Sequence, residues 1–487
     1  MHFVVKYFPE ITIKSPPVRQ RFTQQLRRNL QHRLKATLSC EFTINRGWDR
    51  LDIQLHLAEL DEAAIRKQTT EVLRTTPGIA YFAAASLFEF DDLEHLAATA
   101  ASYWQLLPLP GTFCVRVKRS GKHDFSSSDI ERLTGANVLQ QHPNAKVKLK
   151  DPDTLLRLEV TGQRCFVVHE QQAGMGGFPL GALDPVLSLV SGGFDSTVAS
   201  YLTMRRGLVT HFLFFNLGGP AHELGVKEVS YFLWRTYGAS QPVKFISVPF
   251  AAVVQAILQT IDRSQMGVVL KRMMLRIAER VADDLKIDAL VTGESVAQVA
   301  SQTLRNLKVI DSVTSNLVLR PLIAMDKGDI IAVARTIGTE NFSAQMPEYC
   351  GVISVKPTTR ASEAKVAGEE ARFPWQKLEQ AFAQRQVQSI TAVANDLTVD
   401  LSVPTNTVVS DGAIVIDIRH PNEVENTPLQ LSEATIKTIP FYQLSAQFPH
   451  LDQNQRYWLY CDQGVMSQLH AAHLKDAGYH NVGVFRP

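Results

Sequence analysis

Residues 185–196 read Pro-Val-Leu-Ser-Leu-Val-Ser-Gly-Gly-Phe-Asp-Ser, an apolar run that ends in a pair of glycines. The run 185–190 is predicted to be a short buried strand, and residues 196–205 continue as a helix. Two glycines let the backbone approach a phosphate closely, and N–H groups at a helix start donate to anionic oxygens. The stretch therefore predicts an anion-binding turn between a strand and a helix.

The side chains of this turn add polar groups of two kinds. Ser191 and Ser196 supply hydroxyl donors, whereas Asp195 would repel a phosphate and is predicted to position Mg²⁺ or the loop itself. A glycine-rich turn that simply opens a helix is the alternative, and the flanking strand and helix weigh against it. The sequence contains no Gly-x-x-x-x-Gly-Lys-Ser/Thr, which excludes a standard P-loop NTPase.

Strands and helices alternate on the carboxyl side of the turn. Further apolar runs typical of strands occur at residues 209–215, 243–248, 289–292 and 317–319. This alternation predicts an α/β unit with a parallel, doubly wound sheet. A turn-rich break at 174–179 marks its start, so the unit is expected over residues 177–360. A charged segment, 361–404, follows and is predicted to be a helical connector.

The residues before the break predict two smaller α/β modules. Residues 1–60 read as strand, helix, strand, which suits a ferredoxin-like unit, and residues 61–166 form a second module with a helix capped near Ser126. Basic residues outnumber acidic ones by ten to three over residues 1–50 and by eight to three over 116–150. Both clusters are candidates for phosphate contacts, with solvated helix faces as the alternative. The candidate contact residues are Arg116, Lys118, Arg119 and Lys122.

Residues 405–487 form the last predicted α/β unit and contain a second candidate centre. Cys461 follows an apolar strand and begins a short loop that leads into a helix. Backbone N–H groups in such a loop point inward and stabilise a thiolate or persulfide anion. The alternative is that Cys461 is a buried residue at the end of a strand.

Composition sets the outer limits of the prediction. A chain of 487 residues predicts about three domains, and 45% hydrophobic with 20% charged residues indicates globular domains. The chain shows no charged leader and no apolar segment of membrane length, so a cytoplasmic protein is expected. Its five cysteines form no Cys-x-x-Cys pair, which disfavours a disulfide framework or a cysteine-only metal site. Cys40, Cys114 and Cys165 are predicted to be small buried residues of strands, whereas Cys350 is expected to be exposed in a turn.

Three further stretches place the glycine turn in a specific context: residues 293–303, 320–327 and 345–354. The pattern Ser-Gly-Gly-x-Asp-Ser resembles the PP-loop of ATP pyrophosphatases. With these stretches, the whole chain resembles the tRNA uridine 4-sulfurtransferase (4-thiouridine synthetase) family. The resemblance implies a THUMP RNA-binding domain at 61–166, a PP-loop ATP pyrophosphatase domain at 177–360 and a rhodanese-like domain at 405–487.

The resemblance also implies which residues act. Asp195 and Lys327 would be essential to the chemistry, although a lysine such as Lys327 would by itself be assigned to the solvated surface. Cys461 would carry sulfur as a persulfide, and Cys350 would attack that sulfur so that a transient disulfide joins the two cysteines. The residues implied to contact ATP are Leu189, Val190, Ser191, Gly192, Gly193, Phe194, Ser196, Lys271, Gly293 and Gln302.

The Cys461 loop resembles the rhodanese active-site loop, and the run Asp417-Ile418-Arg419 matches the Asp-x-Arg of that domain. Many rhodaneses carry an arginine within the loop, where this chain has Gln463, Val465 and Met466. This difference favours a persulfide donor protein over a small thiosulfate anion as the sulfur source.

The implied reaction uses ATP with Mg²⁺ to adenylate O4 of a tRNA uridine, expected from the family to be U8, before sulfur replaces that oxygen. The implied partners are tRNA, a cysteine desulfurase, a disulfide reductant and a sulfur carrier of the thiamine thiazole pathway. Two alternatives stay open. One is a PP-loop synthetase that acts on a small molecule and does not need Cys461. The other is a sulfur-relay or RNA-binding protein with a vestigial ATP site.

Overall fold

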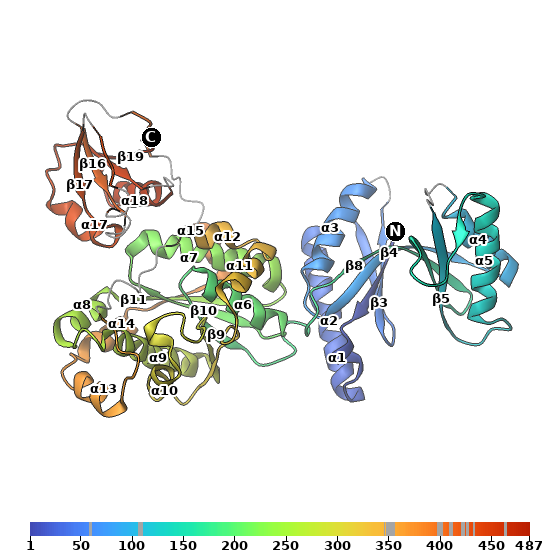
Figure 1. The fold of residues 1–487 in the computed structure, drawn as a ribbon, viewed down its shortest axis with the longest axis horizontal. Helices are drawn as coiled ribbons and strands as arrows, with labels where there is room; N and C mark the ends of the chain where they lie inside the picture. Colours follow the sequence, from blue (N-terminus) through green and yellow to red (C-terminus); the bar gives the residue numbers. More distant parts are fainter. Residues whose placement is uncertain are drawn as a thin grey trace. The chain divides into compact units, whose positions relative to one another are not determined.

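A computed structural model divides the chain into two compact units, residues 1–182 with 205–207, and residues 183–204 with 208–487 (Figure 1). Among the described helices, none combines the length and the apolar character that a membrane crossing requires. The structure describes residues 1–57, 61–105, 111–344, 346, 356–396, 403–408, 413–419, 424, 428–431, 434–461 and 465–487.

An eight-stranded sheet forms the first unit, in the order β2-β3-β1-β4-β8-β7-β5-β6. Neighbouring strands are antiparallel, except that β5 runs parallel to both β6 and β7. Strand β4 pairs with β1 on one side and β8 on the other, so one continuous sheet spans the first two predicted modules. The strands are β1 His2–Tyr7, β2 Glu41–Arg46, β3 Arg50–His56, β4 Ile79–Glu89, β5 Thr112–Ser120, β6 Lys146–Val147, β7 Thr154–Thr161 and β8 Arg164–Ala173.

The helices in the described part of this unit are α1 Pro9–Thr12, α2 Pro16–Thr37, α3 Glu62–Arg74, α4 Leu93–Ser102 and α5 Ser127–Gln141. The predicted cap of α5 is confirmed, because Ser126 and Asp129 form a reciprocal capping box. Cys114 and Cys165 are buried in β5 and β8, as predicted. The prediction for Cys40 is wrong, since it lies half-buried just before β2, a strand that the sequence analysis missed.

The second unit contains a six-stranded sheet in the order β13-β12-β9-β10-β11-β14. The first five strands are parallel, and Figure 1 shows α7 and α9 on opposite sides of them, which confirms the predicted doubly wound sheet. The strands are β9 Val186–Val190, β10 Thr210–Asn216, β11 Lys244–Pro249, β12 Ala289–Val291, β13 Leu317–Leu319 and β14 Gln386–Ser389. The α-helices up to residue 344 are α6 Phe194–Arg205, α7 Gly219–Leu233, α8 Ala251–Thr260, α9 Met266–Leu285, α10 Leu304–Asp311, α11 Lys327–Thr336 and α12 Glu340–Ala344.

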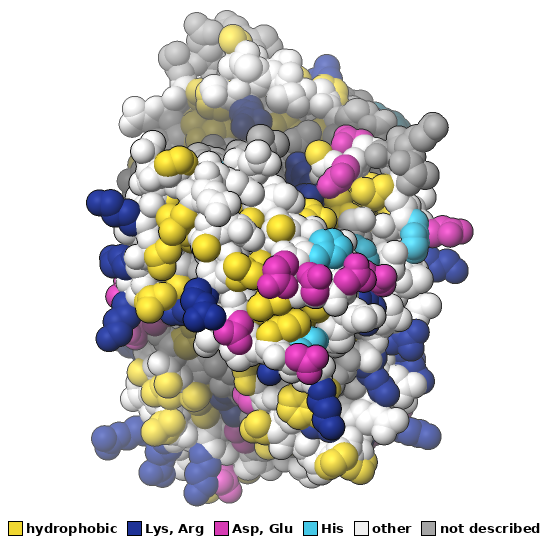
Figure 2. All heavy atoms as spheres, turned by 90° about the vertical axis from the view of Figure 1, so that its right-hand side faces the viewer, with side chains coloured by type: hydrophobic (Ala, Val, Ile, Leu, Met, Phe, Trp, Pro, Cys, Tyr) yellow, Lys and Arg dark blue, Asp and Glu magenta, His cyan; other side chains and the backbone are white. Residues whose placement is uncertain are grey.

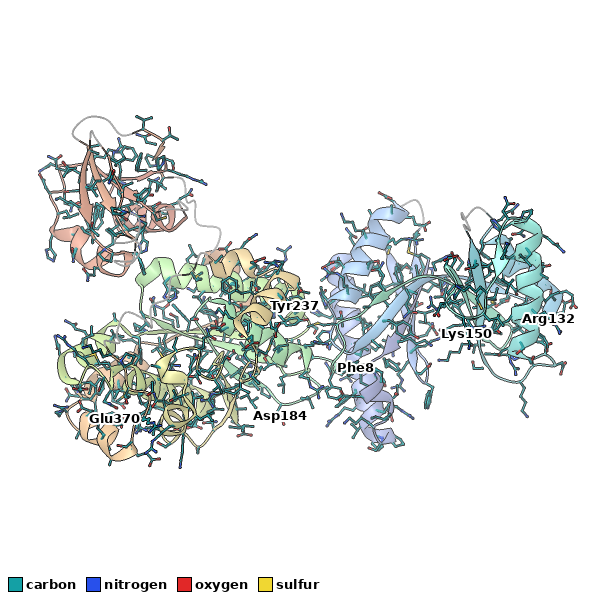
Figure 3. All side chains as sticks on the ribbon, in the orientation of Figure 1. Phe8, Arg132, Lys150, Asp184, Tyr237 and Glu370 are labelled. Carbon is teal, nitrogen blue, oxygen red and sulfur yellow. The ribbon has the colours of Figure 1, made fainter. Side chains whose placement is uncertain are left out.

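The predicted helical connector packs against this sheet. It contains α13 Glu363–Glu370, α14 Gln376–Ala383 and α15 Ile390–Asp396. The purely helical prediction is wrong for residues 386–389, which form the antiparallel edge strand β14 beside β11. Glu370, labelled in Figure 3, accepts a bidentate ion pair from buried Arg272 of α9 at 2.7 and 3.0 Å. The segment is therefore joined to the six-stranded sheet by backbone hydrogen bonds and to α9 by an ion pair.

A five-stranded parallel sheet follows, in the order β15-β19-β18-β16-β17. Its strands are β15 Thr405–Asn406, β16 Ala413–Asp417, β17 Ala434–Thr438, β18 Tyr457–Tyr460 and β19 Val482–Phe485, and its helices include α17 Phe441–Gln447 and α18 Val465–Asp476. Because parallel strands share one carboxyl edge, the ends of β16 and β18 lie side by side.

Candidate active site

The glycine turn joins β9 to α6 and is stabilised by hydrogen bonds of its own serines. The Ser196 hydroxyl accepts the N–H of Ser191 at 3.1 Å and donates to the Gly193 carbonyl at 3.2 Å. Gly192 has a φ of +82°, a conformation that favours glycine. Among the described residues, the N–H groups of Gly192 and Gly193 have no hydrogen-bond partner. The turn thus keeps backbone donors available for an anion.

Asp195 connects this turn to two other segments. One carboxylate oxygen accepts Lys327 Nζ at 2.8 Å, and the other accepts the Gln298 amide at 2.9 Å. Lys327 begins α11, and its ammonium also lies 5.5 Å from the Phe194 ring. Lys327 and Asp195, 132 residues apart in the chain, are therefore neighbours at the start of α6. Sequence analysis missed Gln298 as a partner of Asp195.

Gly293 packs directly against the start of α6. A Cβ at this position would lie 2.5 Å from the Asp195 carbonyl carbon and 2.7 Å from the Ser196 nitrogen. Real Cβ atoms do not approach backbone atoms so closely, so a side chain here would displace the turn. Gly293 thus sets the distance between the end of β12 and the glycine turn.

Glu294, the next residue, is the centre of a buried charge cluster and is only 7% exposed. It accepts Lys271 Nζ at 2.5 Å and Arg320 Nε at 2.7 Å, and Arg320 also pairs with Asp311. Burial alone would raise the pKa of Glu294, but the charges of Lys271 and Arg320 outweigh it and hold that pKa below its ordinary value. Lys271, predicted to contact ATP, is thus placed by a carboxylate that sequence analysis did not single out.

We expect Glu294→Gln to lower the free energy of unfolding by about 3 kcal/mol, because two partly buried cations lose the buried carboxylate that they share. The ionised carboxylate stabilises the fold above its ordinary pKa of 4.5, and this contribution is lost as the pH falls through the lowered value. Denaturant titrations at neutral and acidic pH should therefore show a stability difference between wild type and variant that narrows in acid. Glu340→Gln, in an exposed pair with Arg335, is the control and should change little.

Of the other predicted nucleotide contacts, two directly precede the turn in the chain, and a third is a buried glutamine. Leu189 and Val190 end β9, and Val190 is buried. Gln302 is buried, and its Oε1 has no hydrogen-bond partner among the described residues. A buried amide oxygen without a partner is costly, so this group is a candidate to bind a ligand donor.

His222 of α7 forms a hydrogen bond to the turn, and sequence analysis also missed this residue. Its Nε2–H donates to the Ser191 carbonyl at 3.2 Å. Burial lowers the pKa of His222 to about 4, so the ring is neutral at physiological pH and acts as a fixed donor. The sequence shows only a histidine in a helix of mixed apolar and charged residues, which does not indicate its partner.

Cys461 lies where predicted, directly after β18. Its Sγ accepts the backbone N–H of Ser467 at 3.3 Å and lies 3.5 Å from the Ser467 hydroxyl. Ser467 stands in the first turn of α18, whose N-terminal end favours an anion. The side chain of Cys461 is 7% exposed. The geometry thus provides one backbone donor to a sulfur anion at the N-terminal end of a helix.

The predicted Asp-x-Arg pair lies beside this thiol. Strand pairing sets Asp417 opposite Tyr460, next to Cys461. Arg419 donates to Asp417 from Nε at 2.9 Å and from Nη2 at 2.7 Å, and both side chains are buried. This bidentate pair stiffens the carboxyl edge of the sheet where the sulfur would be held. Cys350, Gln463 and the Cys350–Cys461 disulfide lie outside the described residues.

The four residues proposed to contact RNA lie on or just after β5, and three of them have partners within the protein. Arg116 donates to the Leu149 carbonyl at 2.8 Å, and Arg119 bonds His123 at 3.0 Å. Lys118 pairs with Asp49 at 2.6 Å, and Lys122 is exposed. On the face drawn in Figure 2, acidic and histidine side chains gather near the middle, and most basic side chains lie toward the edges. Candidate RNA contacts are therefore better sought where cations lack acidic partners.

No described group of three or more His, Cys, Asp or Glu side chains is arranged to hold a metal ion. The Asp195 carboxylate accepts hydrogen bonds on both oxygens, which fits the second role predicted for it, positioning the loop. A Mg²⁺ role for Asp195 stays a prediction.

Comparison with known families gives four matches along the chain. Residues 2–83 match the ThiI ferredoxin-like domain and residues 89–170 the THUMP domain. Residues 181–374 match the family described as thiamine biosynthesis protein (ThiI), and residues 406–486 match the rhodanese-like domain.

Relatives of the same length occur in several bacteria. The chain is 50% identical to a protein named tRNA sulfurtransferase of Pseudomonas syringae pv. tomato over 488 residues, and also 50% identical to one of Saccharophagus degradans over 487. In both cases 100% of each chain is covered.

Among solved structures, a 4-thiouridine synthetase–RNA complex with bound ATP matches with a TM-score of 0.70 and 26% identity, over 80% of this chain and 99% of that one. The protein PH1313 of Pyrococcus horikoshii shares the fold with a TM-score of 0.53 and 19% identity, over 69% of this chain and 100% of that one.

Proposed function

Because the chain belongs to the tRNA sulfurtransferase family, we propose that it activates a tRNA uridine with ATP and replaces the uridine O4 with sulfur carried on Cys461. The observation that carries the proposal is the presence of two complementary centres in one chain. One is a glycine turn with available backbone donors, and the other is a thiol held at the start of a helix. An adenylating site makes an oxygen a leaving group, and a persulfide supplies the replacing atom.

In the first stage, uridine O4 attacks the α-phosphate of ATP and pyrophosphate leaves. The free N–H groups of Gly192 and Gly193 would bind the phosphate oxygens, and Lys327, fixed by Asp195, would neutralise charge that develops in the transition state. Lys271 would be kept in position by Glu294. Mg²⁺ bound with ATP would screen the phosphate charge further. A bound ATP in the related complex structure supports this use of the site.

In the second stage, the terminal sulfur of a Cys461 persulfide attacks C4 directly or after release as sulfide, and AMP leaves. In either route Cys350 takes over the bond to Cys461, so a disulfide forms and a two-electron reductant must reopen it. The Ser467 N–H would stabilise the thiolate that results at Cys461. A cysteine desulfurase would reload the sulfur, and the same persulfide could serve thiazole synthesis for thiamine.

We expect the purified protein, incubated with ATP, a persulfide source, a dithiol reductant and unmodified tRNA, to produce 4-thiouridine with one pyrophosphate per thiolated nucleoside. Mass analysis of tRNA nucleosides measures the product, and a coupled phosphate assay measures the pyrophosphate. The control omits tRNA and should release little pyrophosphate, since O4 is the attacking atom. Pyrophosphate release at the full rate without RNA would instead indicate a small-molecule synthetase.

A further inference from the structure

A pocket of about 270 Å³ lies in the first unit between the β2–β3 hairpin and the start of α2. Its lining includes Arg46, Gly47 and Trp48 from the hairpin and Pro16, Arg19 and Gln20 from the helix. Trp48 is 70% exposed. An indole this exposed contributes little to a hydrophobic core, so its presence at a hairpin tip calls for another explanation.

The hairpin holds Trp48 in place through its neighbours on both sides. The Gly47 N–H donates to the Arg50 carbonyl at 2.9 Å, and the Gly47 carbonyl accepts the Tyr7 hydroxyl at 3.4 Å. On the other side, the Asp49 carboxylate binds Lys118 at 2.6 Å and Lys6 at 3.5 Å. The exposed ring is therefore presented by an anchored turn.

The cations around the ring lack acidic partners. The Arg19 guanidinium lies 5.0 Å from the Trp48 ring centroid. Among the described residues, neither Arg19 nor Arg46 forms an ion pair. This differs from the charged residues of β5, whose side chains are largely engaged within the protein. An aromatic face beside unpaired guanidinium groups is the combination that binds an unpaired nucleotide, since a base stacks on the ring and its phosphate pairs with arginine.

A second exposed tryptophan also lies beside an arginine, but that arginine has an acidic partner. Trp375 is 41% exposed and has the Arg276 guanidinium 5.2 Å from its ring. Arg276, however, pairs with Glu370 at 3.1 Å, so its guanidinium is already engaged within the protein. Trp375 thus provides a stacking surface without an available cation and is a matched control.

We propose that the pocket formed by Trp48, Arg19, Arg46 and Gln20 binds one unpaired nucleotide of the RNA substrate. The base stacks on the indole, the Gln20 amide is available to a base edge, and the two arginines bind the adjoining phosphate. The proposal rests on the proposed function, because it takes RNA as the substrate. An acidic peptide would satisfy the arginines but offers no obligatory ring to stack on Trp48.

The test compares the full-length protein on two RNAs, a fully paired duplex and the same duplex with unpaired nucleotides. We expect Trp48→Ala to weaken binding of the second RNA about tenfold and to leave binding of the duplex unchanged. Trp48→Phe keeps an aromatic face and should restore most of the affinity. Arg46→Ala should reduce the slope of log Kd against log salt concentration by about 1, the amount expected for the loss of one phosphate contact. Trp375→Ala should bind both RNAs as wild type does.

Fluorescence gives an independent readout. The difference between wild type and Trp48→Phe isolates the emission of Trp48, which should be quenched by the RNA with unpaired nucleotides and not by the duplex. If Trp48→Ala loses the same affinity for both RNAs, or loses none for either, the pocket assignment is overturned. The proposed function still stands in that case, provided that the wild-type protein thiolates tRNA. A wild-type protein that neither binds nor thiolates tRNA would overturn the proposed function itself, and the pocket assignment with it.

Discussion

Replacement of Cys461 by serine is expected to lower 4-thiouridine formation at least about 1000-fold, because the sulfur carrier is lost while the turn at Ser191 is untouched. Pyrophosphate release in the presence of tRNA should continue for at least one turnover. The serine can still accept the Ser467 N–H, so the fold around α18 should be retained. Mass analysis of nucleosides and a pyrophosphate assay on the same samples separate the two steps.

Cys40→Ser is the matched control, since Cys40 is a half-buried free cysteine of the first unit. It should keep both activities. A second readout is the mass of the protein after exposure to a persulfide donor, where wild type gains a sulfur that Cys461→Ser does not. Full thiolation by Cys461→Ser would mean that sulfur reaches the base by another route, and it would favour an ATP-dependent synthetase that has no need of this residue.

The parts of the site that could be predicted are those encoded by neighbouring residues. The glycine turn is read from a strand, two glycines and a helix within about a dozen positions, and the structure places β9 and α6 there. Cys461 is found the same way, from the strand before it and the helix after it. In both cases the local pattern determines the local conformation, so tertiary context adds little.

Charge clusters could not be predicted, because their members are distant in sequence. Glu294 meets Lys271 and Arg320 across 23 and 26 residues, and nothing in the chain indicates which lysine or arginine will face it. Strand β14 was missed for a similar reason. Its sequence, Gln-Val-Gln-Ser, is polar and mostly exposed, and the strand exists because the edge of β11 offers hydrogen bonds.

A neutral amide at position 195 is expected to impair the ATP-dependent step and to leave sulfur loading intact, whereas the loss of Cys461 impairs sulfur transfer and leaves the ATP-dependent step intact. In Asp195→Asn, the ion pair with Lys327 is lost, and the amide can no longer accept on both sides from Lys327 and Gln298. Lys327 would then be free to leave the position from which it neutralises the departing phosphates. We expect pyrophosphate release to fall about 100- to 1000-fold, whereas sulfur loading on Cys461 should be unchanged.

The kinetic form of this loss distinguishes positioning from binding. If Asp195 holds Lys327 for the transition state, kcat for pyrophosphate release falls far more than KM for ATP rises. Asp184→Asn, at an exposed position just before β9 that Figure 3 labels, is the control and should keep wild-type kinetics. Lys327→Met should reproduce the loss, and combining it with Asp195→Asn should add little, because the two residues act as one unit. Wild-type pyrophosphate release in Asp195→Asn would show that Asp195 does not hold Lys327 for activation of the uridine. Wild-type thiolation without any pyrophosphate release would instead indicate a sulfur relay beside an unused nucleotide site.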